Sequence, residues 1–88
     1  VDVAASLPFE VQAAQCVAAI EKAGQGWVSS TELFDVYAGP NLGPGRKSLA
    51  FHVTLSAGDR TLAEQDLARF LERLGGEVHR LGGDLRRA

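Results

Sequence analysis

Residues 48–56 read SLAFHVTLS, and this stretch decides the fold of the 88-residue chain. Apolar residues alternate with small or polar ones along it, which is typical of a strand with one buried face. The residues predicted to point inward are Leu49, Phe51, Val53 and Leu55, and those predicted to point outward are Ser48, Ala50, His52 and Thr54. The stretch therefore predicts a strand in a sheet that has one covered face and one open face.

A second strand is predicted before this one, from Trp27 to about residue 37. Its period of two places Val28, Phe34 and Val36 on one side and Thr31, Leu33, Asp35 and Tyr37 on the other. Residues 38–47, AGPNLGPGRK, hold three glycines and two prolines, a composition that excludes regular structure. We expect these residues to form a long, exposed connection between the two strands.

Residues 1–24 predict a strand followed by a helix. The strand covers residues 1–7, VDVAASL, and Pro8 closes it. The strand residues that share one face are Val1, Val3, Ala5 and Leu7. From about Val11, the spacing of Ala13, Val17 and Ile20 follows one face of a helix. This helix is expected to end near Gly24.

A second helix is predicted to begin at Thr61, which forms a capping box with Glu64. Apolar residues then keep helical spacing at Leu67, Phe70, Leu71, Leu74, Val78 and Leu81. We expect the helix to reach about Leu81, although Gly75 and Gly76 each cost about 1 kcal/mol relative to alanine. A stop at Leu74 followed by a strand over residues 77–81 is the alternative.

Two further glycines, Gly82 and Gly83, end this region, and residues 84–86 form a short last strand. The order βαββαβ predicts an α+β, ferredoxin-like fold over residues 1–88, a single domain. In this fold two helices cover one face of a four-stranded antiparallel sheet and the other face is open. The outward residues expected to gather on the open face are Ala4, Asp35, Tyr37, Ser48, His52 and Arg86. This architecture alone does not decide the function.

The net charge of −2 argues against a protein that holds nucleic acid by bulk electrostatic attraction. Residues 1–45 hold one basic and five acidic residues, a net charge of −4, whereas residues 46–88 hold eight basic and six acidic ones, a net charge of +2. An anionic partner would therefore be met mainly from the second half of the chain. No apolar stretch reaches the roughly 18 residues that span a membrane, so we expect a soluble domain with no membrane contact.

The sequence lacks the motifs of common catalytic sites, with no P-loop, no HExxH, no GxSxG and no pair of cysteines. Cys16, the single cysteine, is predicted to be a small buried residue. His52 and His79 have no partner at metal-ligand spacing and are predicted to lie on the surface. We therefore expect no catalytic residue, no metal site and no cofactor in this domain.

On the open face, Tyr37 is a candidate platform for an unstacked base, because aromatic rings stack on bases of single strands. The alternative is that Tyr37 ends a strand and packs under the glycine- and proline-rich loop. Asp35 is a candidate acceptor for the amino groups of bases. The candidate phosphate contacts, which are otherwise solvated surface charges, are Arg46, Lys47, Arg86 and Arg87.

Residues 33–55, LFDVYAGPNLGPGRKSLAFHVTL, are followed by RTL at residues 60–62. This pattern resembles the ferredoxin-fold anticodon-binding domain that ends the β subunit of bacterial phenylalanyl-tRNA synthetase. The resemblance extends to Leu85 and Arg86, and it implies a domain cut from the C-terminus of a longer chain. Two features depart from the family pattern. Val1 precedes Asp2 where the family has an arginine, and Gly75-Gly76 interrupts the second helix.

The resemblance implies that the open face receives the anticodon of phenylalanine tRNA, with no DNA partner. Tyr37 would stack on the wobble guanine, and Ala4 would leave room for a base. Asp35, Ser48 and Arg86 would hydrogen-bond to bases or to the RNA backbone.

The resemblance further implies that catalysis lies elsewhere in the parent enzyme, which uses ATP and magnesium to attach phenylalanine to its tRNA. The implied partners are the anticodon stem-loop and the remainder of a cytoplasmic α2β2 heterotetramer. A single-chain organellar synthetase with a similar domain is the other parent that the resemblance allows.

A different class of function stays open at this point. A protein-docking or ligand-sensing domain of the same fold would pair its open face with a partner and bury Tyr37. An enzyme would need a pocket with converging titratable groups, and the sequence offers only Asp35 with scattered neighbours.

Overall fold

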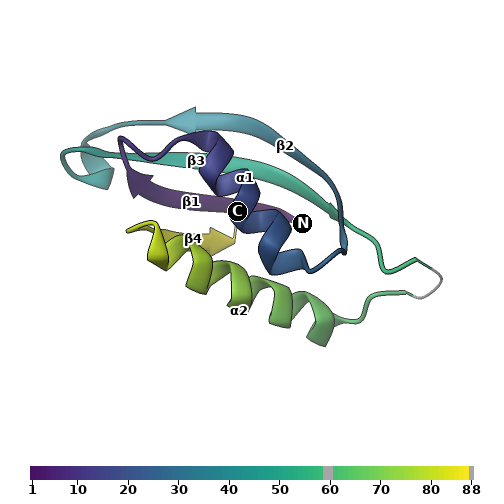
Figure 1. The fold of residues 1–88 in the computed structure, drawn as a ribbon. Helices are drawn as coiled ribbons and strands as arrows, with labels where there is room; N and C mark the ends of the chain where they lie inside the picture. The colour runs from purple at the N-terminus through teal and green to yellow at the C-terminus, as the bar shows by residue number, and fades with distance from the viewer. Residues whose placement is uncertain (59–60, 88) are drawn as a thin grey trace.

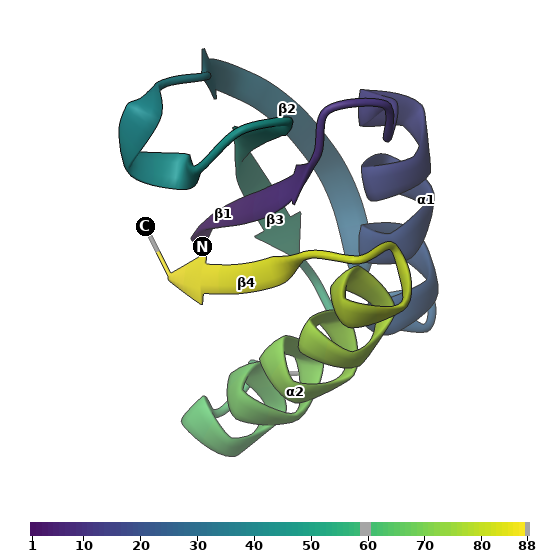
Figure 2. The same ribbon diagram turned by 90° about the vertical axis from the view of Figure 1, so that its left-hand side faces the viewer.

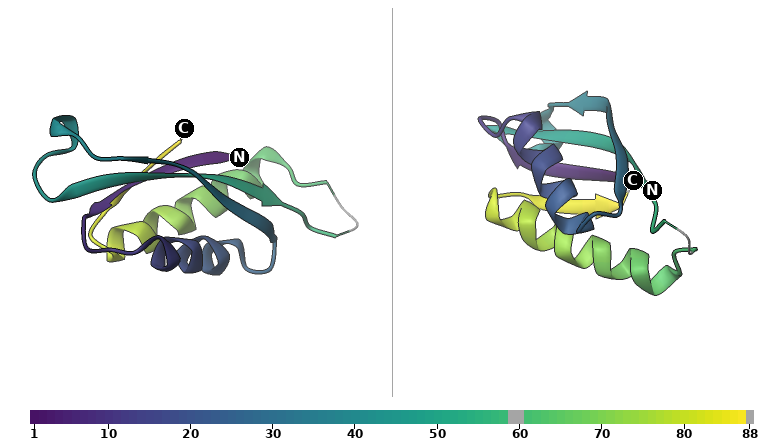
Figure 3. Two further views of the ribbon diagram at one scale, coloured as in Figure 1. Left: turned by 90° about the horizontal axis from the view of Figure 1, so that it is seen from above. Right: turned by 45° about the vertical axis from the view of Figure 1, so that its right-hand side comes forward.

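The computed structural model describes residues 1–58 and 61–87. Its elements in chain order are β1 (Asp2–Pro8), α1 (Ala13–Gly24), β2 (Val28–Tyr37), the 3₁₀ turn η1 (Pro40–Leu42), β3 (Arg46–Leu55), α2 (Glu64–Arg80) and β4 (Asp84–Arg87). The strands form one four-stranded sheet in the order β2-β3-β1-β4, with every neighbouring pair antiparallel. Both helices cover the same face of this sheet (Figure 1, Figure 3). The predicted ferredoxin-like fold is confirmed.

The core lies between the sheet and the helices and is built from alternate strand residues. Those of β3 and β1 are at most 2% exposed, namely Leu49, Phe51, Val53, Val3, Ala5 and Leu7. The helices contribute residues that are fully buried, namely Ile20, Phe70, Leu74 and Val78. The two strands with the cleanest alternation in the sequence are therefore the two central strands of the sheet, and their inward residues are as predicted.

Cys16 lies on the buried face of α1, which confirms the prediction of a small core residue. Burial raises the pKa of the Cys16 thiol to about 11. Because the thiolate is the reactive form of cysteine, this thiol is protonated and unreactive at neutral pH.

Helix α1 ends at Gly24, as the sequence predicts, and Gly24 packs closely against Val28. A Cβ atom at Gly24 would overlap the Val28 side chain. The chain then turns through Gln25 in the left-handed region, at a φ of 49°. The close approach of Gly24 and Val28 joins the end of α1 to the start of β2.

Helix α2 begins at Glu64, so the predicted capping box between Thr61 and Glu64 is wrong. Ala63 is the N-cap residue, and the Asp66 carboxylate accepts a hydrogen bond of 2.8 Å from the Ala63 amide. The capping interaction is thus displaced by two residues along the chain. A carboxylate in the first turn also interacts favourably with the positive end of the helix dipole.

The helical interpretation of residues 75–80 is confirmed, and the alternative strand at residues 77–81 is wrong. Helix α2 passes through Gly75 and Gly76 and ends at Arg80. Leu74 and Val78, on either side of the glycine pair, are both fully buried. Burial of this apolar stripe outweighs the low helix propensity of the two glycines.

Strand β2 departs from the predicted alternation because its register with β3 shifts twice, between Val28 and Ser30 and at a β-bulge between Leu33 and Asp35. Leu33 pairs with Phe51 and Asp35 pairs with Ala50, so Phe34 is an extra residue between them. The Phe34 ring stacks on the His52 ring of the open face. Phe34 therefore points outward and Leu33 points to the helix side, the reverse of the prediction. Thr31 pairs with buried Val53 and also lies on the helix side, contrary to its predicted outward direction.

The connection between β2 and β3 is shorter and more ordered than predicted. Residues 40–42 form the turn η1, and β3 begins at Arg46, two residues before the predicted start. The η1 turn stands on the side of the sheet away from the helices (Figure 2, Figure 3).

Within residues 1–58 and 61–87, neither helix has the length and apolarity needed to cross a membrane.

Replacement of Gly75 or Gly76 by alanine is expected to stabilise the chain by about 0.5–1 kcal/mol each, because alanine has the higher helix propensity. A Cβ atom at either position would have no atom within 4 Å. Gly24→Ala, also in a helix, is the matched control and should destabilise, because its Cβ overlaps Val28. Urea unfolding of the three variants checks this. Equal effects at all three glycines would contradict the structure.

Cys16 is expected to react with iodoacetamide at pH 8 on the order of a hundredfold more slowly in the folded chain than in urea, because its thiolate is scarce when buried. The folded-state rate should rise about tenfold per pH unit below the raised pKa of about 11. Mass spectrometry of the quenched reaction gives both rates. Similar rates in the folded and unfolded chain would show that Cys16 is accessible.

Candidate functional site

The surface of the sheet opposite α1 and α2, called the open face below, is organised in rows by strand pairing. Cross-strand partners in an antiparallel sheet point to the same side. One row runs across all four strands as Tyr37, Ser48, Ser6 and Asp84, and the next row runs as Asp35, Ala50, Ala4 and Arg86. Figure 2 shows the helices gathered on the other side of the sheet.

All five residues singled out as an RNA-binding set lie in these two neighbouring rows. They are Ala4, Asp35, Tyr37, Ser48 and Arg86. They come from all four strands, and none of them is in the buried core. The structure therefore brings the predicted set together on one surface.

Tyr37 packs against the loop, as one prediction has it, and is also partly exposed, as a base platform would be. Its ring rests against Gly39, where an added Cβ atom would overlap the hydroxyl group and lie 2.7 Å from Cζ. The side chain nevertheless remains 45% exposed. The loop thus supports one part of the ring and leaves another part open to a stacking partner.

Arg46 lies at the same end of the open face but is engaged within the protein. Its Nη2 donates to the Ser6 carbonyl (3.1 Å), its Nε donates to Ser6 Oγ (3.3 Å), and its Nη1 donates to the Gly82 carbonyl (3.3 Å). The guanidinium group therefore connects β3 to β1 and to the turn before β4.

Two other candidate phosphate contacts, Lys47 and Arg87, lie outside the two rows that contain Tyr37. Lys47 pairs with buried Leu7, and its Nζ lies 5.5 Å from the centroid of the Phe9 ring. It therefore belongs to the helix side of β3. Arg87 pairs with Val3 in the ladder, and its side chain lies outside the described part of the structure. Among these basic residues, Arg86 alone lies in the two rows with Tyr37.

The structure adds residues to the open face that sequence reasoning did not include in the site. The Phe34 ring stacks on the His52 ring with a centroid separation of 3.8 Å and an interplanar angle of 11°. His52 Nδ1 lies 2.5 Å from Asp2 Oδ1. The exposed positions of His52 and His79 are as predicted. The sequence could not place Phe34 on this face, because the alternation of residues gives no sign of the bulge.

The open face is acidic. Its carboxylates belong to Asp2, Glu32, Asp35 and Asp84, and its guanidinium groups belong to Arg46 and Arg86. Such a surface repels phosphate, but its carboxylates can accept hydrogen bonds from amino groups. The arrangement therefore suits flat aromatic groups that carry hydrogen-bond donors.

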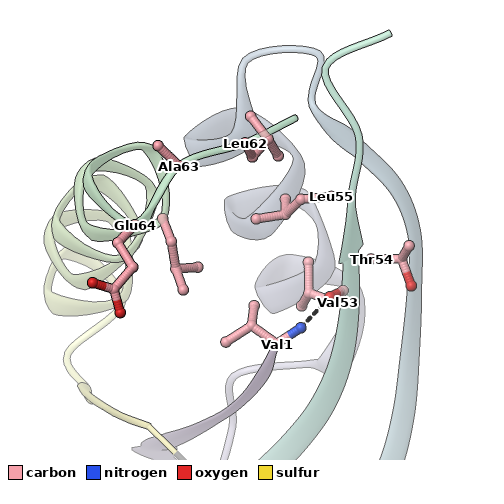
Figure 4. A pocket seen from close by; sticks show the side chains of 8 residues that line it. Val1, Val53, Thr54, Leu55, Leu62, Ala63 and Glu64 are labelled. Atoms are coloured by element: carbon pink, nitrogen blue, oxygen red, sulfur yellow. Dashed lines mark hydrogen bonds between the residues drawn. The ribbon is translucent and has the colours of Figure 1, made fainter. Parts of the chain in front are cut away.

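A groove of about 420 Å³ lies away from this face, between β3 and the start of α2 (Figure 4). It is lined by Val1, Val53, Thr54, Leu55, Leu62, Ala63, Glu64 and Leu67. Among the described residues of that lining, Glu64 is the one with an acidic side chain. Over residues 1–58 and 61–87, no three His, Cys, Asp or Glu side chains are placed to hold a metal ion. The described lining of this groove therefore lacks the converging titratable groups that a catalytic pocket needs.

A family model described as the ferredoxin-fold anticodon binding domain matches residues 1–86. Similar proteins include the phenylalanine–tRNA ligase beta subunits of Trichormus variabilis (41% identical over 75% of this chain and 8% of the relative) and Symbiobacterium thermophilum (35%, over 97% and 10%). The beta subunit of Rhodospirillum rubrum is 39% identical over 96% of this chain and 11% of the relative.

The chain spans about one tenth of the length of these relatives. The match nevertheless covers almost every residue of the sheet and both helices. The fold and the family model thus agree over the same residues. The chain belongs to the family of ferredoxin-fold anticodon binding domains, of the kind found in beta subunits of phenylalanine–tRNA ligase.

Proposed function

We propose that the open face binds the unpaired anticodon bases of phenylalanine tRNA and so serves recognition in a phenylalanine–tRNA ligase. One observation carries this proposal. Tyr37, which is 45% exposed, shares two neighbouring rows of the sheet with Asp35, Ser48 and Arg86. An aromatic ring flanked by hydrogen-bonding groups is the usual means of holding an unstacked base.

The residues of the two rows have separate roles in this proposal. Tyr37 stacks on the wobble guanine, a contact of about 1–3 kcal/mol per base. Asp35 accepts hydrogen bonds from base amino groups, while Ser48 and Arg86 bond to base edges or to the RNA backbone. Ala4 is the partner of both Ala50 and Arg86 and leaves room above the middle of the row.

Recognition and catalysis are divided in this proposal. The ATP- and magnesium-dependent attachment of phenylalanine takes place elsewhere in the parent enzyme, an α2β2 heterotetramer in the cytoplasm. The acidic open face offers selectivity for bases but little attraction for phosphate. The isolated domain therefore binds RNA weakly and depends on the rest of the ligase to raise the local RNA concentration.

A docking or ligand-sensing domain remains the competing function, and one feature favours it. The aromatic residues Phe34 and Tyr37 are both exposed, and a partner sheet would bury them. The two functions predict different binding by the free chain. A docking domain would bind a protein partner or self-associate and would not distinguish one RNA hairpin from another.

Titration with the anticodon stem-loop of phenylalanine tRNA is expected to shift the NMR signals of Asp35, Tyr37, Ser48 and Arg86, because these residues line the two rows. A hairpin with changed anticodon bases should shift them less. Tyr37→Ala should weaken binding by about 1–3 kcal/mol, and Tyr37→Phe, which keeps the ring, should weaken it little. Equal shifts with both hairpins would favour the docking function.

Gly39→Ala is expected to displace the Tyr37 ring, because the added methyl group overlaps its hydroxyl group. The Tyr37 ring signals should move in the free chain, and affinity for the stem-loop should fall at least about threefold if stacking requires the present ring position. Gly76→Ala is the control, since its Cβ meets no atom within 4 Å. Unchanged Tyr37 signals in Gly39→Ala would show that the loop does not support the ring.

A further inference from the structure

The ring pair formed by Phe34 and His52 lies beside the two rows that contain Tyr37. His52 pairs with Asp2 on one side and with Glu32 on the other, which makes a third row next to the row of Asp35. Phe34 occupies the bulge between Leu33 and Asp35. The stacked rings and Tyr37 therefore belong to one continuous surface.

Both rings of the pair remain open to solvent. Phe34 is 43% exposed and the His52 side chain is 47% exposed, even though the two rings stack at 3.8 Å. Stacking covers one face of each ring. The exposed fractions show that part of each residue outside this contact is accessible to solvent. An uncovered aromatic ring face on an open sheet is the kind of surface on which bases of single strands stack.

Asp2 holds the pair in a defined orientation. Its carboxylate oxygen Oδ1 lies 2.5 Å from His52 Nδ1 and accepts a hydrogen bond from it. The bulge in β2 fixes the direction of Phe34 from the other strand. The two rings are therefore preorganised before any ligand arrives, which lowers the entropic cost of stacking on them.

The spacing along β2 suits a single-stranded ligand that also contacts Tyr37. Phe34 and Tyr37 are three residues apart, which is at most about 10 Å along a strand, because the bulge at Phe34 shortens the advance. Asp35 lies between them and points to the same face. Two aromatic surfaces with a hydrogen-bond acceptor between them can receive two bases of one unstacked chain.

We infer that the Phe34–His52 pair is a second stacking position, which holds an unpaired base close to the base on Tyr37. This inference rests on the proposed function and extends it from one base platform to two. The ligand at the second position is the flat face of an RNA base. Binding through the base face is favoured over contact with phosphate, because the carboxylates of Asp2 and Glu32 flank His52.

The test is a double-mutant cycle between Phe34 and the loop of the anticodon hairpin. Phe34→Leu keeps an apolar side chain and removes the ring, and hairpins with a single abasic residue remove one loop base at a time. Phe34→Leu is expected to weaken binding of the intact hairpin by about 5- to 100-fold. With one abasic hairpin, and not with the others, this loss should shrink to less than about twofold.

Phe9→Leu is the matched control for the loss of an exposed phenylalanine. Phe9 is 61% exposed, and its ring lies beside Lys47 on the helix side of the sheet. This variant should bind every hairpin as the original chain does. Thermal unfolding of both variants separates lost affinity from lost structure, and His52→Leu should reproduce the coupling to the same abasic position.

The outcomes separate this inference from the function on which it rests. Loss of binding in Tyr37→Ala with none in Phe34→Leu would overturn the second position and leave the anticodon function intact. A loss in Phe34→Leu that is equal for every abasic hairpin would also overturn it, since the ring would then act only on the shape of β2. Absence of hairpin binding by the original chain would overturn both.

Discussion

The burial of alternate residues of β3 is the constraint on which the rest of the structure depends. Phe51 and its neighbours on β3 fill the centre of the core, between the sheet and both helices. Because side chains alternate in a strand, the same burial fixes Ser48 and His52 on the other side. A slip by one residue would expose Phe51, at a cost of about 1.5–3 kcal/mol for that side chain alone. The core therefore sets the composition of the open face.

Elements whose pattern is local could be predicted from the sequence. The alternation of β1 and β3, and the apolar stripe of α2 across Gly75-Gly76, each determine one buried face without reference to the rest of the chain. The start of α2 could not be predicted in this way. Thr61 and Ala63 are each followed three residues later by a carboxylate, and only packing of the helix selects the second pair.

The candidate site likewise contains some residues that a local pattern could place and others that it could not. Asp35, Tyr37, Ser48 and Arg86 could be placed on one face from alternation, because each is next in sequence to an apolar residue on the helix side, namely Val36, Leu49 or Leu85. Phe34 could not, since its direction follows from pairing with β3. The three hydrogen bonds of Arg46 reach Ser6 and Gly82, which are 36 to 40 residues away along the chain, so no local sequence pattern predicts them.

The bulge in β2 has a consequence for how this surface can change during evolution. Without Phe34, Leu33 and Val36 would still face the helices, and Asp35 and Tyr37 would still face away, in an unbroken alternation. Phe34 is thus equivalent to a one-residue insertion that the sheet accommodates without a change in the core. Insertions and deletions at this point can add or remove a ring on the open face while every buried contact of β3 stays in place. Within strand β2, the bulge is a position where length and function can vary independently of the fold.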